Sequence, residues 1–235
     1  MPSNVPSSVS QPKPSSSRIE LDERAALIVV DVQNGFVTGG NLAVPRGEEV
    51  VPVINRIAPA FLNVVLTQDW HPAGHASFAG SHAGKKPFDF VDLAYGSQVL
   101  WPEHCVQGSP GARLHPDFPT DGLTLLLRKG AATEIDSYSA FRENTGPDGV
   151  RRTTGLGALL RARGITRVFV CGLARDFCVR WTAIDAAEEG FAVVVLNDLC
   201  RAVFPARAAV TDAAFAAAGV LHEHSLVHCA APVPA

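Results

Sequence analysis

The segment Arg24-Ala-Ala-Leu-Ile-Val-Val-Asp31 decides the fold. Residues 25–30 are all apolar, and a carboxylate follows them at once. A continuous apolar run of this length predicts a strand that is buried on both faces, as in parallel sheets. Further strands are predicted at 63–67, 123–127, 167–171, 191–196 and 220–221. Helical spacing of apolar residues lies between them, at 48–62, 154–163, 176–189 and 205–218.

Strands that alternate with helices predict an α/β protein. We expect a three-layer sandwich whose six-stranded, mostly parallel, doubly wound sheet is covered by helices on both faces. No repeat or change in composition divides the core, so residues 23–228 are predicted to form one domain. Residues 1–22 are rich in Ser and Pro and are predicted to be a disordered tail, and residues 229–235 a flexible C-terminal tail.

The composition excludes several classes of protein. Of 235 residues, 47% are hydrophobic and 18% are charged, which is enough apolar material for a sizeable core. The net charge of −3, without a basic run, argues against binding to nucleic acid or to an anionic membrane. The apolar runs are far shorter than the roughly 20 residues of a transmembrane helix. The five cysteines are odd in number and scattered, which indicates a reducing cytoplasm.

Reactive side chains follow the predicted strands. Asp31, Asp69 and Lys129 each come just after a strand, at the sheet edge where α/β proteins bind ligands. Cys178 lies at the first turn of a predicted helix, where the helix dipole and free N–H groups favour a thiolate. An Asp accepts a thiol proton and a Lys stabilises the resulting charge. Cys178 is therefore the candidate nucleophile, and the other cysteines are interpreted as small buried hydrophobes.

A second group of residues has the chemistry of a metal site. The segment Asp69-Trp-His71 places a carboxylate and an imidazole on one side of an extended chain. A second imidazole, His104, returns after a Gly-rich loop. These donors suit Zn²⁺, and also Fe²⁺ or Mn²⁺, and three ligands leave positions open for a substrate. The other nearby histidines, including His75, are interpreted as hydrogen-bonding or surface residues.

Six motifs resemble those of the nicotinamidases, which belong to the isochorismatase-like cysteine hydrolases. They are Val30-Asp31-Val-Gln-Asn-Gly-Phe36, Thr67-Gln-Asp69-Trp-His71-Pro-Ala-Gly-His75, Trp101-Pro-Glu-His104-Cys-Val, Arg128-Lys129-Gly130, Asp136-Ser-Tyr138-Ser-Ala-Phe141 and Cys171-Gly-Leu-Ala-Arg-Asp-Phe-Cys178-Val. They cover about residues 24–222. The resemblance implies an isochorismatase-like hydrolase fold. It also implies hydrolysis of nicotinamide to nicotinate and ammonia through a thioester on Cys178, in NAD salvage, with pyrazinamide as a second candidate substrate.

The resemblance also implies roles for individual residues. The catalytic triad would be Asp31, Lys129 and Cys178. The metal ligands would be Asp69, His71 and His104, with Ser77 at the variable fourth position of the family. The N–H groups of Ala174 and Cys178 would form an oxyanion hole after a cis peptide bond between Leu173 and Ala174. The substrate ring would lie between Phe36, Trp101 and Tyr138.

The same residues are also compatible with other functions. A sister cysteine amidase would use the same triad on a different small amide, and many such enzymes lack the metal. An isochorismatase cleaves a vinyl ether without a cysteine nucleophile, so Cys178 argues against it. A non-catalytic metal or thiol sensor on the same fold would bind metal but hydrolyse no amide. A monomer and a homo-oligomer are both compatible with the sequence.

Overall fold

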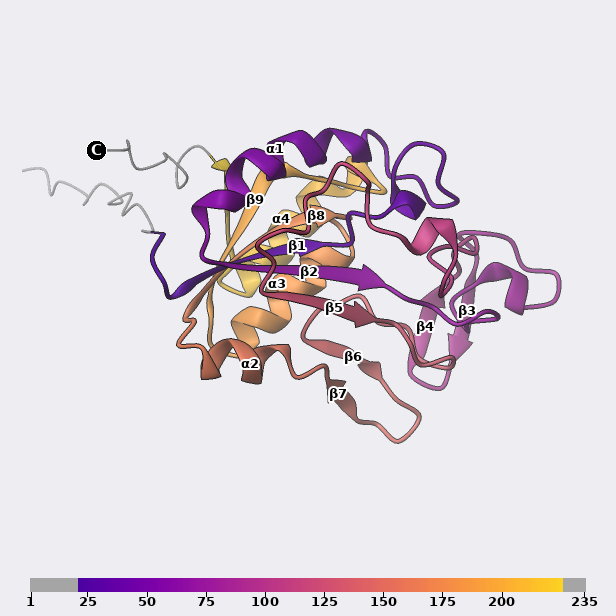
Figure 1. The fold of residues 1–235 in the computed structure, drawn as a ribbon. Coiled ribbons are helices and arrows are strands. Elements are labelled where there is room, and N and C mark those ends of the chain that lie inside the picture. Colours follow the sequence, from indigo (N-terminus) through magenta and orange to yellow (C-terminus); the bar gives the residue numbers. More distant parts are fainter. Residues whose placement is uncertain (1–20, 226–235) are drawn as a thin grey trace, which may run out of the picture.

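A six-stranded parallel sheet forms the centre of the protein in a computed structural model that describes residues 21–225 (Figure 1). Its strand order is β10-β9-β8-β1-β2-β5, and every pair of neighbours is parallel. The strands are β1 (Ala25–Val30), β2 (Asn63–Asp69), β5 (Leu125–Lys129), β8 (Arg167–Leu173), β9 (Ala192–Arg201) and β10 (Leu221–Glu223). The predicted α/β fold is confirmed.

The strand order creates a crevice beside β1. From β1 the chain builds outward through β2 to β5, and it then returns to the other side of β1 to form β8, β9 and β10. The connections therefore diverge at the carboxyl ends of β1 and β8, where open α/β sheets bind their ligands. Every residue of β1 is buried, as its apolar run predicts.

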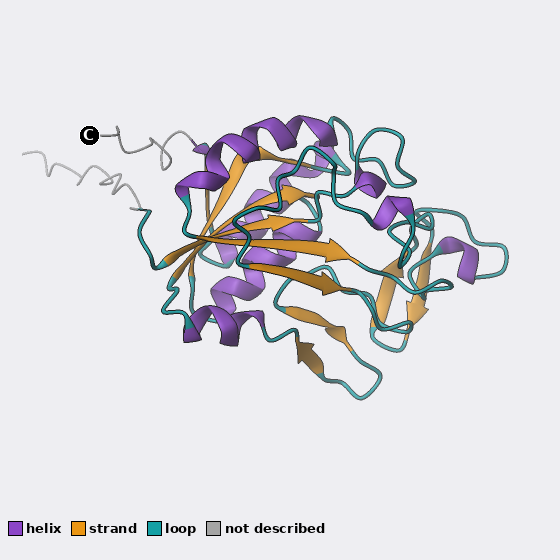
Figure 2. Ribbon diagram, viewed as in Figure 1, coloured by secondary structure: helices purple, strands orange, loops and turns teal. Residues whose placement is uncertain are grey.

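Helices lie on both sides of this sheet (Figure 2). They are α1 (Val50–Ile57), α2 (Leu156–Ala162), α3 (Cys178–Glu188) and α4 (Ala208–Ala217). The helix predicted over 48–62 is shorter than expected, because Pro59 has no N–H to donate and its ring opposes the α conformation of the preceding residue. A 3₁₀ turn over Ala58–Ala60 replaces the last turn. The prediction that Cys178 lies in the first turn of a helix is confirmed.

Two hairpins were not predicted. They are formed by β3 (Phe90–Leu93) with β4 (Gly96–Val99), and by β6 (Arg142–Thr145) with β7 (Arg151–Thr153). Both have few buried residues, so their sequences lack a clear apolar alternation. The first hairpin lies beyond the carboxyl end of β2 (Figure 1), close to the edge where the reactive residues gather.

The ends of the domain differ slightly from the prediction. Leu21 packs on the core, and Asp22 forms an ion pair with Arg167, so the described domain already includes these two residues. The rest of the predicted N-terminal tail and the whole segment 229–235 lie outside the described residues. Among residues 21–225, no helix is long and apolar enough to cross a membrane.

Candidate active site

The three predicted catalytic side chains meet at the carboxyl ends of β1, β5 and β8. The ammonium group Nζ of Lys129 lies 2.9 Å from Oδ2 of Asp31 and 3.4 Å from Sγ of Cys178. All three residues are buried. Parallel strands bring their carboxyl ends to one edge, so residues that are 49 to 147 positions apart in the chain come together.

Burial decides the protonation of the nucleophile. Removal from water is the main cause that raises the pKa of the Cys178 thiol well above its ordinary value of 9.0, and the Lys129 ammonium opposes this only in part. The expected stabilisation of a thiolate at the helix start is thus outweighed, and Cys178 rests as a thiol. A cysteine in this state needs a neighbouring base to become a nucleophile.

Asp31 is placed to be that base. Thr67 donates a hydrogen bond of 2.6 Å to Oδ1 of Asp31 and accepts one of 3.1 Å from its backbone N–H. Oδ2 has no hydrogen-bonding partner among the described residues, although the Lys129 ammonium lies beside it. Burial, opposed by Lys129, raises the pKa of Asp31. Its φ of 48° is unusual for a non-glycine residue and holds the carboxylate at the strand end.

Lys129 also connects the triad to the second predicted cluster. Its Nζ donates to Oδ1 of Asp69 at 2.5 Å and to the carbonyl oxygen of Ser137 at 3.0 Å. Burial opposes the charge of Lys129, but the carboxylates of Asp31 and Asp69 outweigh it and hold the Lys129 pKa well above 10.5. Burial opposes the charge of Asp69 as well, yet Lys129 and His71 hold its pKa well below 3.8. Lys129 and Asp69 are therefore a charged pair.

The other carboxylate oxygen of Asp69 faces two imidazoles. Its Oδ2 lies 3.4 Å from Nε2 of His71 and 3.7 Å from Nε2 of His104. In each ring the opposite nitrogen, Nδ1, lies beside a backbone carbonyl, that of Gly130 at 2.9 Å and that of Pro102 at 2.8 Å. A carbonyl only accepts, so Nδ1 of each ring carries a proton, and Nε2 is the nitrogen that would bind a metal.

This arrangement fits a divalent metal. Ligand atoms of Asp69, His71 and His104 lie within 4.8 Å of one another, and all three residues are buried. Two imidazole nitrogens and one carboxylate are the donors of a catalytic Zn²⁺ site with open positions. The prediction of these three residues as one cluster therefore agrees with the geometry.

Two neighbouring residues complete the picture of the cluster. The Oγ of Ser77 lies 2.8 Å from Nδ1 of His75, and within the described residues it makes no hydrogen bond to Asp69, His71 or His104. His75 is fully buried, and its Nε2 lies 3.3 Å from the carbonyl oxygen of Ile135. Both nitrogens of His75 are thus partnered within the protein, as expected for a hydrogen-bonding histidine.

One cavity joins the Cys178 nucleophile, the metal cluster and the predicted aromatic wall of Phe36, Trp101 and Tyr138. Its lining residues are Phe36, Leu42, Asp69, His71, Trp101, His104, Asp136, Tyr138, Ala174, Phe177, Cys178 and Val203. Leu42, Asp136, Phe177 and Val203 were not predicted, although Asp136 and Phe177 lie within quoted motifs. The free space is about 20 Å³, roughly one water molecule, so side chains must move apart before an aromatic amide enters.

Two backbone N–H groups remain available beside the nucleophile. In the part of the chain that the structure describes, the N–H groups of Ala174 and Cys178 donate no hydrogen bond to a protein acceptor. Cys178 begins α3, so its N–H is one of the helix donors without an intrahelical partner. The peptide bond between Leu173 and Ala174 is cis, as the resemblance implies.

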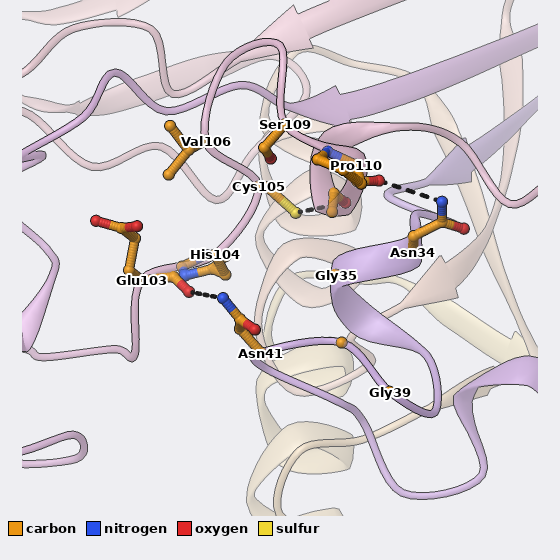
Figure 3. A pocket seen from close by; sticks show the side chains of 12 residues that line it. Asn34, Gly35, Gly39, Asn41, Glu103, His104, Cys105, Val106, Ser109 and Pro110 are labelled. Carbon is orange, nitrogen blue, oxygen red and sulfur yellow. Dashed lines mark hydrogen bonds between the residues drawn. The ribbon is translucent and has the colours of Figure 1, made fainter.

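Cys105, the other cysteine that could be considered as a nucleophile, lies beside a different pocket. Cys105 lines a pocket of about 370 Å³ formed by the loops around residues 34–41 and 103–111 (Figure 3). Its thiol points to the carbonyl oxygen of Gly111, 3.6 Å away. Burial raises the pKa of Cys105 well above 9.0, and the carboxylates of Asp69 and Asp31 raise it further. Cys105 is not among the residues that line the cavity beside Cys178.

Comparison with known proteins agrees with this site. Residues 25–223 match the isochorismatase domain. The chain therefore belongs to the isochorismatase family. A nicotinamidase of Acinetobacter baylyi is 51% identical over 187 residues, which are 79% of this chain and 85% of the relative. Identity at this level over most of both chains places the sequence among the nicotinamidases of the family.

Solved structures show the same similarity. A nicotinamidase and pyrazinamidase of Acinetobacter baumanii superposes with a TM-score of 0.83 at 48% identity, covering 87% of this chain and 98% of that protein. A pyrazinamidase of Pyrococcus horikoshii, solved in complex with zinc, superposes with a TM-score of 0.67 at 32% identity, covering 86% and 99%. The isochorismatase-like hydrolase fold is thereby confirmed.

Proposed function

We propose that this protein is a nicotinamidase, a cysteine amidohydrolase that converts nicotinamide and water to nicotinate and ammonia in NAD salvage. One observation supports the proposal: the Cys178 thiol, held beside the buried pair of Asp31 and Lys129, opens into the same cavity as a cluster of metal-ligating donors. The thiol supplies amide chemistry, and the cluster supplies a means to select a ring that contains a nitrogen. The similarity to nicotinamidases supports the same substrate.

The first half of the reaction forms a thioester. Asp31 removes the proton of the Cys178 thiol, and Lys129 stabilises the thiolate sulfur 3.4 Å away. The sulfur attacks the carboxamide carbon and forms a tetrahedral intermediate. Its oxyanion accepts hydrogen bonds from the N–H groups of Ala174 and Cys178, and one such donor contributes about 10²–10³ to the rate. Asp31 returns the proton to the leaving nitrogen, and ammonia departs.

The second half hydrolyses this thioester. Asp31, again ionised, takes a proton from a water molecule that occupies the place of ammonia. The hydroxide attacks the thioester carbon, and the same N–H groups hold the oxyanion. The C–S bond then breaks, Asp31 returns its proton to the departing Cys178 sulfur, and nicotinate is released. Lys129 remains charged throughout and holds the Asp31 carboxylate and the Cys178 sulfur in their positions on either side of its ammonium group.

Asp69, His71 and His104 would hold a divalent metal, for which we propose Zn²⁺ ahead of Fe²⁺ or Mn²⁺, with Ser77 as a fourth donor. When bound, the metal supplies a Lewis acid that coordinates a pyridine nitrogen. Phe36, Trp101 and Tyr138 would flank the ring and keep water away from the carboxamide. Pyrazinamide carries a ring nitrogen at the equivalent place and is proposed as a second substrate.

The test is ammonia release from nicotinamide by the purified protein, with and without a metal chelator. Cys178→Ala should abolish release, whereas Cys105→Ala, the matched loss of a buried thiol outside the cavity, should leave at least half of it. Release that survives Cys178→Ala, or release from an unrelated amide but none from nicotinamide, would contradict the proposal. A protein that binds metal but hydrolyses no amide would be the sensor instead.

We also propose a cytoplasmic location. The five cysteines are odd in number and scattered along the chain, a pattern typical of a reducing compartment. We propose that one catalytic domain spans residues 23–228 and that the tails on either side of it take no part in the chemistry.

A further inference from the structure

We propose that Asp136 completes the charge balance of the metal cluster and thereby sets its affinity for a divalent cation. This inference rests on the proposed metal site and adds a residue that neither the triad nor the ligand set contains. Asp136 follows β5 in the motif Asp136-Ser-Tyr138, and no step of the proposed reaction uses its carboxylate.

The position of Asp136 is the first observation. Its side chain is 2% exposed and lines the same cavity as Asp69, His71 and His104. One of its carboxylate oxygens lies within 4.8 Å of ring nitrogens of both His71 and His75. Because the nitrogens of His75 are satisfied by Ser77 and Ile135, this group is not a second metal site. Asp136 is instead a buried carboxylate close to the ligand His71.

Hydrogen-bond donors surround the carboxylate of Asp136. The backbone N–H of Ser137 donates to Oδ1 at 2.8 Å, and the side-chain amide of Gln98 donates to Oδ2 at 3.0 Å. A side-chain hydrogen bond also joins the carboxylate to Tyr138. The Tyr138 oxygen already receives the indole N–H of Trp101, so its own hydrogen is free to point to Asp136. A carboxylate surrounded by donors is held in the charged form.

The charged groups in and around the metal cluster sum to a net negative charge. Lys129 contributes one positive charge, and Asp31, Asp69 and Asp136 contribute three negative charges. The histidine ligands are neutral when their Nε2 lone pairs face a metal. The site therefore carries two uncompensated negative charges, which a divalent cation neutralises. Charges this deeply buried interact strongly because little water screens them. Without Asp136, a divalent cation would leave the buried site with a net positive charge.

The alternative role for Asp136 is structural. Gln98 comes from the hairpin β3–β4, and Tyr138 and Trp101 belong to the aromatic wall, so the carboxylate could simply hold these parts together. The two roles differ in what the metal-free protein does. A structural anchor stabilises it, whereas an uncompensated buried negative charge beside Asp31 and Asp69 destabilises it.

The experiment measures Zn²⁺ affinity and thermal stability of the metal-free protein in four forms. These are the wild type, Asp136→Asn, Gln98→Leu and Asp121→Asn. The first variant removes the charge but keeps the shape, and Gln98→Leu breaks the hydrogen bond to Oδ2 but keeps the charge. Asp121→Asn removes an exposed charge before β5, at the opposite edge of the sheet. Affinity is measured by competition with a chromophoric chelator.

Asp136→Asn should bind Zn²⁺ about 10- to 100-fold more weakly, because a buried negative charge close to the ligands is lost. Its metal-free form should melt at the wild-type temperature or above. Gln98→Leu should melt lower but bind Zn²⁺ within threefold of wild type, and Asp121→Asn should change neither property.

Unchanged affinity in Asp136→Asn, or weaker affinity accompanied by a fall of several degrees in the metal-free melting temperature, would overturn the inference in favour of the structural role. If the wild type binds no Zn²⁺, both this inference and the proposed metal site fail. If it binds Zn²⁺ as described but releases no ammonia from nicotinamide, the proposed function fails and the charge balance stands.

Discussion

Replacement of Lys129 by Met tests the central ion-pair arrangement. Lys129 is buried and lies within 2.9 Å of both Asp31 and Asp69. Methionine fills a similar volume but carries no charge, so the variant leaves two buried carboxylates without a cation. We expect loss of activity together with a large loss of stability, because the same ammonium serves the reaction and the fold.

The size of the stability loss follows from the burial of the pair. Removing one partner of a buried ion pair destabilises a protein by about 3–5 kcal/mol. Lys129 neutralises two carboxylates, which would make the loss larger. The variant no longer pays the cost of burying the lysine charge, which makes the loss smaller, so we expect a loss within the same range. With a urea dependence of about 2 kcal/mol/M, the unfolding midpoint should fall by about 2 M.

The destabilisation should also depend on pH. In the variant, burial without a cation raises the folded-state pKa of Asp31 and Asp69 above the unfolded value, so their charge destabilises the fold above that unfolded pKa. This penalty decreases as the pH falls and the carboxylates become protonated. In the wild type, the Asp69 pKa is held well below 3.8, and that contribution is fully present at neutral pH and lost only in acid. The difference in stability should therefore shrink from pH 7 to pH 5 by at least about 1 kcal/mol.

The assay is equilibrium urea unfolding at both pH values, in chelator so that metal does not contribute. Lys86→Met serves as the control, because Lys86 is exposed and should shift the midpoint by less than about 0.5 kcal/mol. A loss below about 1 kcal/mol in Lys129→Met, or a loss that is equal at pH 7 and pH 5, would refute the reasoning.

Three further predictions concern the ligands and the nucleophile. His71→Ala should lose most bound metal and far more activity on nicotinamide than on benzamide, which lacks the ring nitrogen; equal losses would assign the metal another role. Gly130→Ala should weaken Zn²⁺ binding by at least about tenfold, since its Cβ would lie 2.6 Å from the His71 ring. Gly84→Ala, with a similar positive φ but open space, should strain the backbone without that effect, and equal affinities would contradict the steric argument. Iodoacetamide should label Cys178 slowly at pH 7 and steadily faster towards pH 10, because burial raises the thiol pKa; a rate plateau below pH 8 would reveal a resting thiolate.

The fold class and the identity of the reactive groups follow from the order of residues along the chain. Apolar runs such as residues 25–30 indicate buried parallel strands because both faces of such strands are covered. Parallel strands end at one edge, so Asp31, Asp69 and Lys129 could be assigned to one site without coordinates. The motif around Cys178 supplied the nucleophile, because a strand and a helix start flank it.

Only the tertiary structure decided how these groups are charged and oriented. The sequence favoured a thiolate at Cys178, but depth of burial outweighs the helix start and leaves a thiol. The tautomers of His71 and His104 depend on two carbonyl groups whose positions no periodicity reveals. Asp136 lies in the loop between β5 and β6, and its place beside the cluster follows from no periodicity. Charge and hydrogen bonding depend on distances of a few ångströms between residues far apart in the chain, whereas strands and helices depend on neighbours within it.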